Sequence, residues 1–229
     1  MAEKDIEKLK IAAAREAVNF VKDQMIVGLG TGSTAEYFIK LLVERANMGI
    51  NIKVIASSVR TYKLAKTGNL DVLDINDVDK IDIVVDGADE IDDQKNIIKG
   101  GGGALLREKI LASASDIMIV IADSSKIVKQ LGNRAIPVEM IPYGYKFTMG
   151  EIHKIGFKSE LRLNENKEPF ITDNHNYILD VSLDTFVADP QHIHSRILSI
   201  PGVVETGLFF DLNPKLIIAS SISDVKIID

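Results

Sequence analysis

An acidic stretch followed by consecutive glycines holds the residues whose types and spacing most suggest chemistry. The segment "VVDGADEIDD" (84–93) places five carboxylates directly after a run of β-branched residues. The segment "IIKGGGGALLREKIL" (97–111) places Lys99 before four glycines and Glu108 on a predicted helix. Neighbouring carboxylates repel each other, and each glycine loses much backbone entropy on folding, so this combination needs a functional reason. Proton abstraction next to a carbonyl would use a carboxylate as the base and a cation to stabilise the enolate oxygen.

The acidic loop follows an apolar strand, at the strand end where open α/β sheets usually bind ligands. Asp86 and Asp89 are three residues apart across the turn Gly87–Ala88, so both can face one pocket. Two other interpretations stay open: a solvated turn, and a Mg²⁺ site built from carboxylates. The solvated turn explains Asp92–Asp93 better than Asp86, because a residue at a strand end is usually partly buried.

Lys99 and Glu108 lie on either side of the glycines. A lysine at this position can reach into space that no side chain fills. An acidic residue in the first turn of a helix complements the helix dipole, which is the structural alternative for Glu108. If the helix starts near Gly103, however, Glu108 lies beyond the first turn, and the alternative is weakened.

The segment "GLGTGSTA" (28–35) joins a predicted strand to a predicted helix. Glycines let the backbone approach a ligand closely, and the first N–H groups of the helix are available to an anion. Ser33 and Thr34 add hydroxyl donors. The segment lacks the third glycine of a dinucleotide fingerprint and the G-K-[ST] of a P-loop. The alternative is a tight turn in which Ser33 or Thr34 caps the helix.

The elements that must position these residues alternate between strand and helix up to about residue 130. Apolar strands are predicted at 25–29, 52–56, 81–85 and 117–122, with helices near 34–46, 61–66 and 104–114 between them. This order predicts an α/β fold with a Rossmann-like, mainly parallel sheet and helices on both faces. The strands predicted at 216–220 and 225–228 can return to this sheet. We therefore assign residues 1–130 and 206–229 to a Rossmann-like domain.

Residues 131–205 have a different pattern. Strands near 136–142, 160–163, 177–181 and 203–209 and helices near 147–155 and 190–198 give a β-α-β-β-α-β order. This order is typical of a small α+β domain.

The composition excludes several classes of protein. The chain has 229 residues, a net charge of −6 and a pI of about 5.3, which argues against a nucleic-acid surface. The absence of cysteine removes disulfides and thiolate chemistry and fits a cytoplasmic protein. The N-terminal segment is too charged for a signal peptide, and no apolar run is long enough to span a membrane. The four histidines, including the pair His192 and His194, are interpreted as surface residues rather than metal ligands.

Taken together, these segments resemble type A ribose-5-phosphate isomerase. The resemblance rests on segments that occur in family order between about residues 28 and 210: "GLGTGSTA", "VVDGADEID", "IKGGGGALLREKI", "IADSSK", "PVEMIP", "TDNHNYILDV" and "IPGVVETGLF". Two positions depart from the family pattern. Gly103 replaces a common alanine, and His175 stands where the family usually has glycine, which leaves the shape of that turn open.

The resemblance implies reversible conversion of ribose 5-phosphate and ribulose 5-phosphate through an enediolate, without a metal or an organic cofactor. It implies that Glu108 is the general base and that Lys99 stabilises the enediolate oxygen. Asp86, with Asp89 beside it, would open the sugar ring and move hydroxyl protons. The implied substrate-binding residues, several of them at the phosphate, are Thr31, Gly32, Ser33, Thr34, Asp86, Gly87, Ala88, Asp89, Lys99, Gly100, Gly101, Gly102 and Lys126.

The resemblance also implies that the smaller domain is ferredoxin-like and that the protein is a homodimer or homotetramer, with oligomerisation through that domain. The expected partner is a sugar phosphate, with no nucleic acid and no membrane. Two other functions stay open: an amino-sugar phosphate deaminase on a similar scaffold, and a sugar-phosphate-sensing regulatory domain. The second would need a basic helix-turn-helix, and the residues before Gly28 are too few for one. A nicotinamide oxidoreductase is disfavoured by the missing third glycine.

Overall fold

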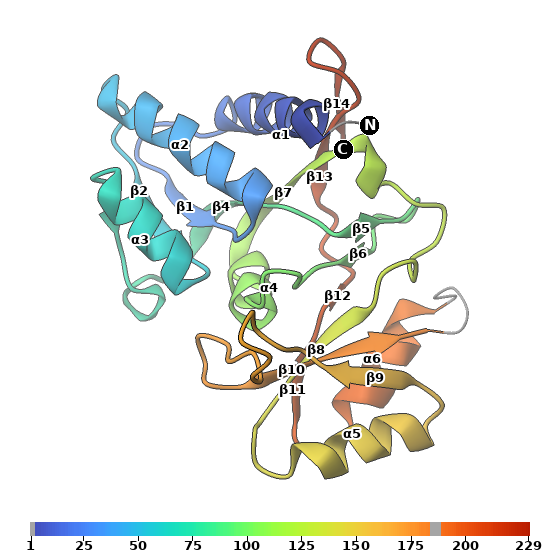
Figure 1. The fold of residues 1–229 in the computed structure, drawn as a ribbon. Coiled ribbons are helices and arrows are strands. Elements are labelled where there is room, and N and C mark those ends of the chain that lie inside the picture. The colour runs from blue at the N-terminus through green and yellow to red at the C-terminus, as the bar shows by residue number, and fades with distance from the viewer. Residues whose placement is uncertain (1–2, 184–188) are drawn as a thin grey trace. The chain divides into compact units, whose positions relative to one another are not determined.

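The computed structural model describes residues 3–183 and 189–229. The chain divides into two compact units. The first consists of Met1–Ala88, Arg107–Lys126 and Leu212–Asp229, and the second of Asp89–Leu106 and Ile127–Asp211 (Figure 1). Residues 89–106 thus lie with the second unit, whereas the sequence assignment placed them in the Rossmann-like domain. That assignment of domains stays a prediction.

The first unit is built on a seven-stranded sheet with the order β14-β13-β7-β4-β1-β2-β3. All neighbouring pairs are parallel except β13 with β14, which is antiparallel. The mainly parallel sheet and the return of the C-terminal strands to it are therefore confirmed. The strands are β1 (Ile26–Leu29), β2 (Lys53–Ala56), β3 (Asp71–Val72), β4 (Ile81–Asp86), β7 (Ser115–Asp123), β13 (Lys215–Ala219) and β14 (Val225–Ile228).

Both faces of the central strands are buried, as the continuous apolar runs predicted. Successive residues of β4, such as Ile83 and Val84, are both about 1% exposed, although they point to opposite faces. The helices α1 (Glu3–Val18) and α2 (Ser33–Asn47) pack against one another, and α1 also packs on β7 and β13 (Figure 1). A further helix of this unit is α3 (Val59–Thr67), whose N-cap Ser58 accepts the N–H of Thr61.

The strand order reverses between β1 and β4, and this reversal positions the two loops of interest. β1 has β2 on one side and β4 on the other, and Leu29 lies opposite Val85. The loop after Leu29 and the loop after Asp86 therefore leave the sheet at the same edge. In open α/β sheets this edge, at the point of reversal, is where ligands bind.

The second unit contains a four-stranded antiparallel sheet with the order β11-β8-β10-β9. With its two helices, this order is that of a ferredoxin-like fold, as predicted. Its core includes Val138, Leu179 and Ile197, all fully buried. The elements are β8 (Ile136–Met140), α5 (Tyr145–Lys154), β9 (Lys158–Leu161), β10 (Tyr177–Ser182), α6 (Pro190–Leu198) and β11 (Val203–Thr206).

The second unit also contains a small three-stranded sheet that the sequence did not predict. It pairs β5 (Glu90–Ile91), β6 (Ile97–Ile98) and β12 (Leu208–Phe209). Part of the predicted acidic loop is thus a buried strand. The single strand predicted at 203–209 is divided at Gly207, where an added Cβ would lie 2.2 Å from the Lys99 carbonyl oxygen.

Two turns show how the chain accommodates its departures from the family pattern. His175 adopts a left-handed conformation with φ of 62°, and its N–H donates to the Thr172 carbonyl at 2.9 Å. Gly103 has φ of 77°, and a Cβ added there would lie 2.4 Å from the Phe170 ring. The glycine therefore suits its position, and the histidine takes the conformation that a glycine would favour.

Candidate active site

Asp86 is the last residue of β4, at the start of the acidic loop. Its side chain is hydrogen-bonded to the loop that follows β1. Its side chain is 1% exposed. Its Oδ1 accepts the backbone N–H of Thr31 at 3.2 Å and that of Gly87 at 2.7 Å. These two donors fix the carboxylate in one orientation. The buried position agrees with the expectation that a solvated turn explains Asp86 poorly.

The N-terminus of α2 carries no side-chain cap. The helix begins at Ser33, with Gly32 as its N-cap and no side-chain hydrogen bond to the cap. The alternative in which Ser33 or Thr34 caps the helix is therefore not what the structure shows. Gly32 has φ of 126°, and an added Cβ would meet nothing within 4 Å, so the backbone here faces open space.

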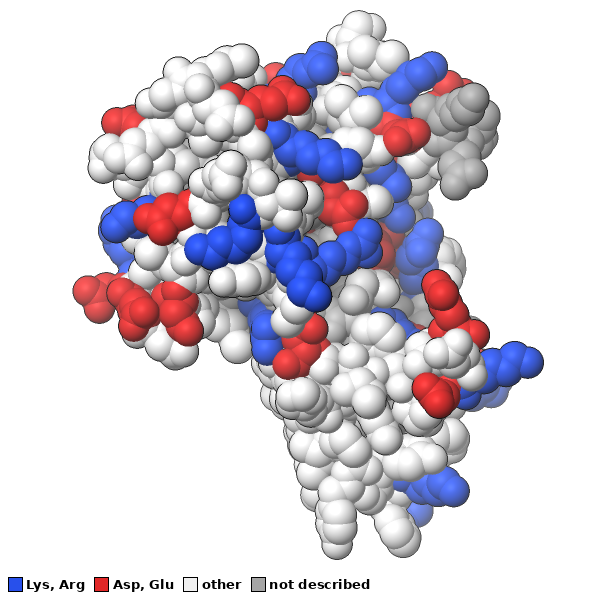
Figure 2. Space-filling view, turned by 60° about the vertical axis from the view of Figure 1, so that its left-hand side comes forward, with Lys and Arg blue, Asp and Glu red and all other residues white. Residues whose placement is uncertain are grey.

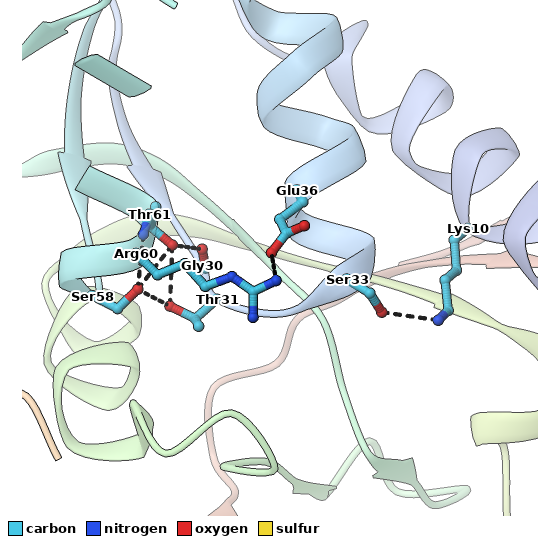
Figure 3. A network of polar contacts seen from close by, with 8 residues as sticks. All are labelled: Lys10, Gly30, Thr31, Ser33, Glu36, Ser58, Arg60 and Thr61. Carbon is cyan, nitrogen blue, oxygen red and sulfur yellow. Dashed lines mark hydrogen bonds and ion pairs between the residues drawn. The ribbon is translucent and has the colours of Figure 1, made fainter. Parts of the chain in front are cut away.

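A cluster of hydroxyl groups from serine and threonine side chains holds the loop that follows β1. Thr31 Oγ1 lies 2.7 Å from Ser57 Oγ. It also lies 2.8 Å from Ser58 Oγ (Figure 3). Thr61 Oγ1 donates to the Gly30 carbonyl at 2.9 Å. Sequence reasoning missed this cluster, because single serines and threonines after a strand look like ordinary helix caps.

Lys10 is a second residue that sequence reasoning missed. Its Nζ donates to Ser33 Oγ at 2.9 Å, which places a cation at the N-terminus of α2 (Figure 3). Nearby, Glu36 in the first turn of α2 forms an ion pair with Arg60. The sequence shows Lys10 only as a polar position of an amphipathic helix, and its partner depends on how α1 packs on α2.

Gly87 brings the acidic loop next to the α2 N-terminus and the end of β7. A Cβ added at Gly87 would lie 3.9 Å from Thr34 Cβ and 3.9 Å from the Ile121 carbonyl oxygen. Lys126 ends the short 3₁₀ helix η2 (Ser124–Lys126) that follows β7. Because β7 is the neighbour of β4 in the sheet, these segments leave it at one edge.

Glu108 lies in the first turn of α4 (Leu105–Ser113) and is 3% exposed. The prediction that it lies beyond the first turn is wrong, because the left-handed Gly103 is not helical and the helix starts at Leu105. The helix dipole can therefore stabilise this carboxylate. An interaction with the helix dipole does not require burial, however, and glutamate side chains are almost never fully buried unless they are paired.

The second unit holds Lys99, Asp89 and the glycines. The Lys99 side chain is 3% exposed, and its Nζ lies 5.7 Å from the centre of the Phe209 ring. Asp89 donates its N–H to the Ile98 carbonyl at 2.8 Å, and its Oδ2 accepts the N–H of Gly101 at 2.9 Å. Gly101 and Gly102 are exposed and Gly100 is buried.

Among the residues that the structure describes, no three histidine, aspartate or glutamate side chains lie close enough together to hold a metal ion. His192 is exposed, and His194 is half-buried with its Nδ1 at 2.8 Å from Thr206 Oγ1. In the same described part of the chain, no helix combines the length and apolar character needed to cross a bilayer. Figure 2 shows basic and acidic side chains interspersed on the viewed face, in keeping with the net charge of −6.

Comparisons with known proteins show the family to which the chain is related. The family model described as "Ribose 5-phosphate isomerase A (phosphoriboisomerase A)" matches residues 53–222. The chain is 43% identical to ribose-5-phosphate isomerase A of Protochlamydia amoebophila, over 96% of this chain and 95% of the relative. It is 46% identical to that of Sphingopyxis alaskensis, over 92% and 91%.

Solved structures show the same fold. Ribose 5-phosphate isomerase A from Methanocaldococcus jannaschii has a TM-score of 0.92 at 37% identity, covering 97% of this chain and 98% of the other. A D-ribose-5-phosphate isomerase in complex with phospho-erythronic acid has a TM-score of 0.93 at 38% identity, covering 98% and 99%. Family model, sequence relatives and structures all agree, and the chain belongs to the ribose-5-phosphate isomerase A family.

Proposed function

We propose that Glu108 is the general base of the reaction that defines this family. As a member of the family, the chain interconverts ribose 5-phosphate and ribulose 5-phosphate. In this reaction a proton moves between C2 and C1 of the open-chain sugar, and an enediolate lies between the two. The burial of Glu108, at 3% exposure, is the observation that carries the proposal. A buried carboxylate can act on a sugar carbon with little competition from water.

Lys99 supplies the charge that the enediolate needs. Proton removal from C2 leaves negative charge on the carbonyl oxygen, and a cation fixed in advance stabilises it most. The ammonium of Lys99 is buried and lies against the Phe209 ring, which limits its motion. Gly100, Gly101 and Gly102 are further residues that we assign to the substrate, with the N–H of Gly102 as a donor. The N–H of Gly101 is bonded to Asp89 Oδ2 and orients that carboxylate.

Asp86 acts before the proton transfer, when the furanose ring opens. Ring opening requires removal of the C1 hydroxyl proton and protonation of the ring oxygen, and a fixed carboxylate can move both protons. The two backbone N–H groups at Oδ1 hold Asp86 for this task. Asp89 and the turn Gly87–Ala88 complete the sugar-binding part that we propose.

The phosphate binds at Thr31–Thr34, with Lys126. The uncapped N-terminus of α2 offers N–H groups and a favourable dipole to an anion. Lys10, which already donates to Ser33, adds a positive charge at the same helix end. The similar structure in complex with phospho-erythronic acid supports a phosphorylated sugar derivative as the ligand.

Exchange with solvent tests the proton-transfer mechanism. In D₂O, the product should carry deuterium at the exchanged carbon, and Glu108→Gln should lower kcat/KM by on the order of 10²–10⁴-fold while the circular dichroism spectrum stays unchanged. Glu44→Gln, at an exposed position of α2, is the control and should have wild-type activity. Glu108→Gln activity within a few-fold of wild type would remove Glu108 from the base role.

We also propose a homodimer or homotetramer in the cytoplasm, assembled through the second unit. Tyr143, just before α5, is 90% exposed, and Phe147, on α5, is 84% exposed. Exposed aromatic side chains that lie close together can mark an interaction surface. Light scattering should give a mass of two or four chains. Tyr143→Ser with Phe147→Ser should lower that mass, and an unchanged mass would place the interface elsewhere.

A further inference from the structure

The four-glycine segment poses a structural problem, because glycine backbones are flexible and a substrate site needs donors in fixed positions. Within the second unit, one side chain is bonded to this segment twice. Arg162, directly after β9, donates from Nη1 to the Gly100 carbonyl at 2.8 Å and to the Gly101 carbonyl at 3.3 Å. The Gly100 carbonyl also accepts the N–H of Gly103 at 3.0 Å.

Arg162 is itself held by two residues, Asp180 and Phe170. Its Nε donates to Asp180 Oδ2 at 2.9 Å, and its Nη2 donates to Asp180 Oδ1, so the pair is bidentate. Its guanidinium lies 6.0 Å from the Phe170 ring centre, and the Phe170 N–H donates to the Arg162 carbonyl at 2.9 Å. Only 16% of the arginine side chain and 31% of the aspartate side chain are exposed. This pair is far better fixed than an ordinary surface ion pair.

The peptide unit is planar, so fixing a carbonyl also fixes the N–H of the next residue. By bonding to the carbonyls of Gly100 and Gly101, Arg162 sets the directions of the N–H groups of Gly101 and Gly102. The first of these donates to Asp89 Oδ2 at 2.9 Å. Phe170 limits the other end of the segment, since it fills the space beside Gly103.

We infer that Arg162 is a positioning residue for the isomerisation, acting together with Asp180. It touches no reacting atom. It holds the Gly100–Gly102 backbone, and with it Lys99 at the start of the segment, in the orientation that stabilises the enediolate. The inference rests on the proposed function, because it assumes that Lys99 and these glycines contact the substrate. A misplacement of such groups by about 1 Å can cost on the order of 10²-fold in rate.

The fork geometry of arginine is the property to test. Arg162→Lys keeps the charge but cannot bind Asp180 in two places and two carbonyls at once. We expect it to lower kcat by roughly 10–100-fold with a much smaller change in KM. Asp180→Asn, which keeps Arg162 but weakens its hold, should lower kcat in the same direction.

The chain provides a matched control in the same unit. Arg196 also donates to a backbone carbonyl, that of Ile155 at 3.0 Å, and lies 5.8 Å from the Phe157 ring centre. Arg196→Lys should therefore lose similar local contacts and keep wild-type kcat. If Arg162→Lys and Arg196→Lys have the same kcat, the inference is wrong.

Two readouts separate positioning from a general loss of structure. Arg162→Lys should speed amide hydrogen exchange in residues 100–103. It should also weaken the binding of phospho-erythronic acid while the binding of inorganic phosphate is unchanged. Equal weakening for both ligands, or unchanged exchange in residues 100–103, would overturn the inference. Lys99→Met is measured alongside. If Lys99→Met is fully active, the proposed role of Lys99 at the enediolate fails, and with it the premise of the inference. If it is inactive and Arg162→Lys is fully active, only the role of Arg162 fails.

Discussion

Asp86 fills the space that a side chain on residue 30 would occupy. A Cβ added at Gly30 would lie 2.1 Å from Asp86 Oδ1, far closer than atoms can approach. Gly30→Ala should therefore push the carboxylate away from Thr31, destabilise the fold by roughly 1–3 kcal/mol and lower kcat by about 10²-fold. Steady-state kinetics and thermal unfolding measure the two effects.

Gly68→Ala is the matched control, because its Cβ would also clash, at 2.3 Å from Val43 Cγ2, but with no proposed site residue. It should lose comparable stability and keep kcat. A similar loss of kcat in both variants would mean that Gly30→Ala acts through stability rather than through Asp86.

The α2 N-terminus should discriminate between phosphorylated and free sugar. Ser33→Ala and Lys10→Ala should each raise KM for ribose 5-phosphate. For Ser33→Ala, the lost hydroxyl bond should weaken the binding free energy by about 0.5–2 kcal/mol. The effect of either change on unphosphorylated ribose should be close to zero. The Lys10 effect should shrink as salt rises. Equal slowing of both sugars would show that the segment is structural and that the phosphate binds elsewhere.

Gly32→Val should weaken the phosphate interaction more strongly than either change. A Cβ added at Gly32 meets no protein atom within 4 Å, so the lost affinity would come from the space that the phosphate needs and from the φ of 126°. Gly49→Val, with φ of 107° and equally open space, controls for the backbone strain alone and should bind ribose 5-phosphate normally.

The isomerisation should not depend on a metal ion. Lys99 and backbone N–H groups can stabilise an enediolate without a Lewis acid. Activity should therefore survive extensive dialysis against a chelator, measured with the chelator still present. Activity that is lost and then restored by Mg²⁺ or Zn²⁺ would return the acidic loop to consideration as a metal site.

Asp82 should make the stability of the first unit depend on pH. The N–H of Ile26, donated to Asp82 Oδ2 at 2.7 Å, holds the pKa of this carboxyl below its usual value, and Lys80 at 3.1 Å adds to the effect. A lowered pKa means stability that is present above the usual value near 3.8 and lost as the pH falls through the folded-state pKa. Asp82→Ala should thus cost roughly 1.5–3 kcal/mol at pH 7, and the difference should vanish in acid.

Asp116→Ala is the control for this experiment. Asp116 also lies near Lys80, at 3.4 Å, but its side chain is 61% exposed. Chemical denaturation at several pH values should show almost no effect of this change. A pH-independent loss for Asp82→Ala would contradict the proposed link to its ionisation.

The strands and loops that carry Asp86 and Thr31–Thr34 could be predicted because their signals are local. A β-branched run that ends in carboxylates, and a glycine-rich turn before a helix, each lie within a few residues of sequence. The two-residue strands β5, β6 and β12 could not be predicted, since Leu208 pairs with Ile98 across more than a hundred positions. Strands this short have no periodicity of their own.

The hydrogen-bond partners of individual side chains could not be predicted from the sequence either. Lys10 meets Ser33 only because α1 packs on α2, and Arg162 meets the glycines only because the second unit folds around them. The first turn of α4 was misplaced for a related reason. Gly103 reads as a possible helix start, but its left-handed backbone, beside the Phe170 ring, delays the helix to Leu105.

The pairing of β7 with β13 has a consequence for the order in which the protein is made. β13 lies parallel to β7, with Ile119 opposite Lys215. The segment Ile127–Asp211 lies between these two strands in the sequence, so the ribosome makes it after β7 and before β13. During that time the nascent chain carries an apolar strand with one edge unpaired, which is the kind of template on which other chains aggregate. The first strands of this sheet are therefore synthesised early, but β7 gains its second neighbour only near the end of synthesis.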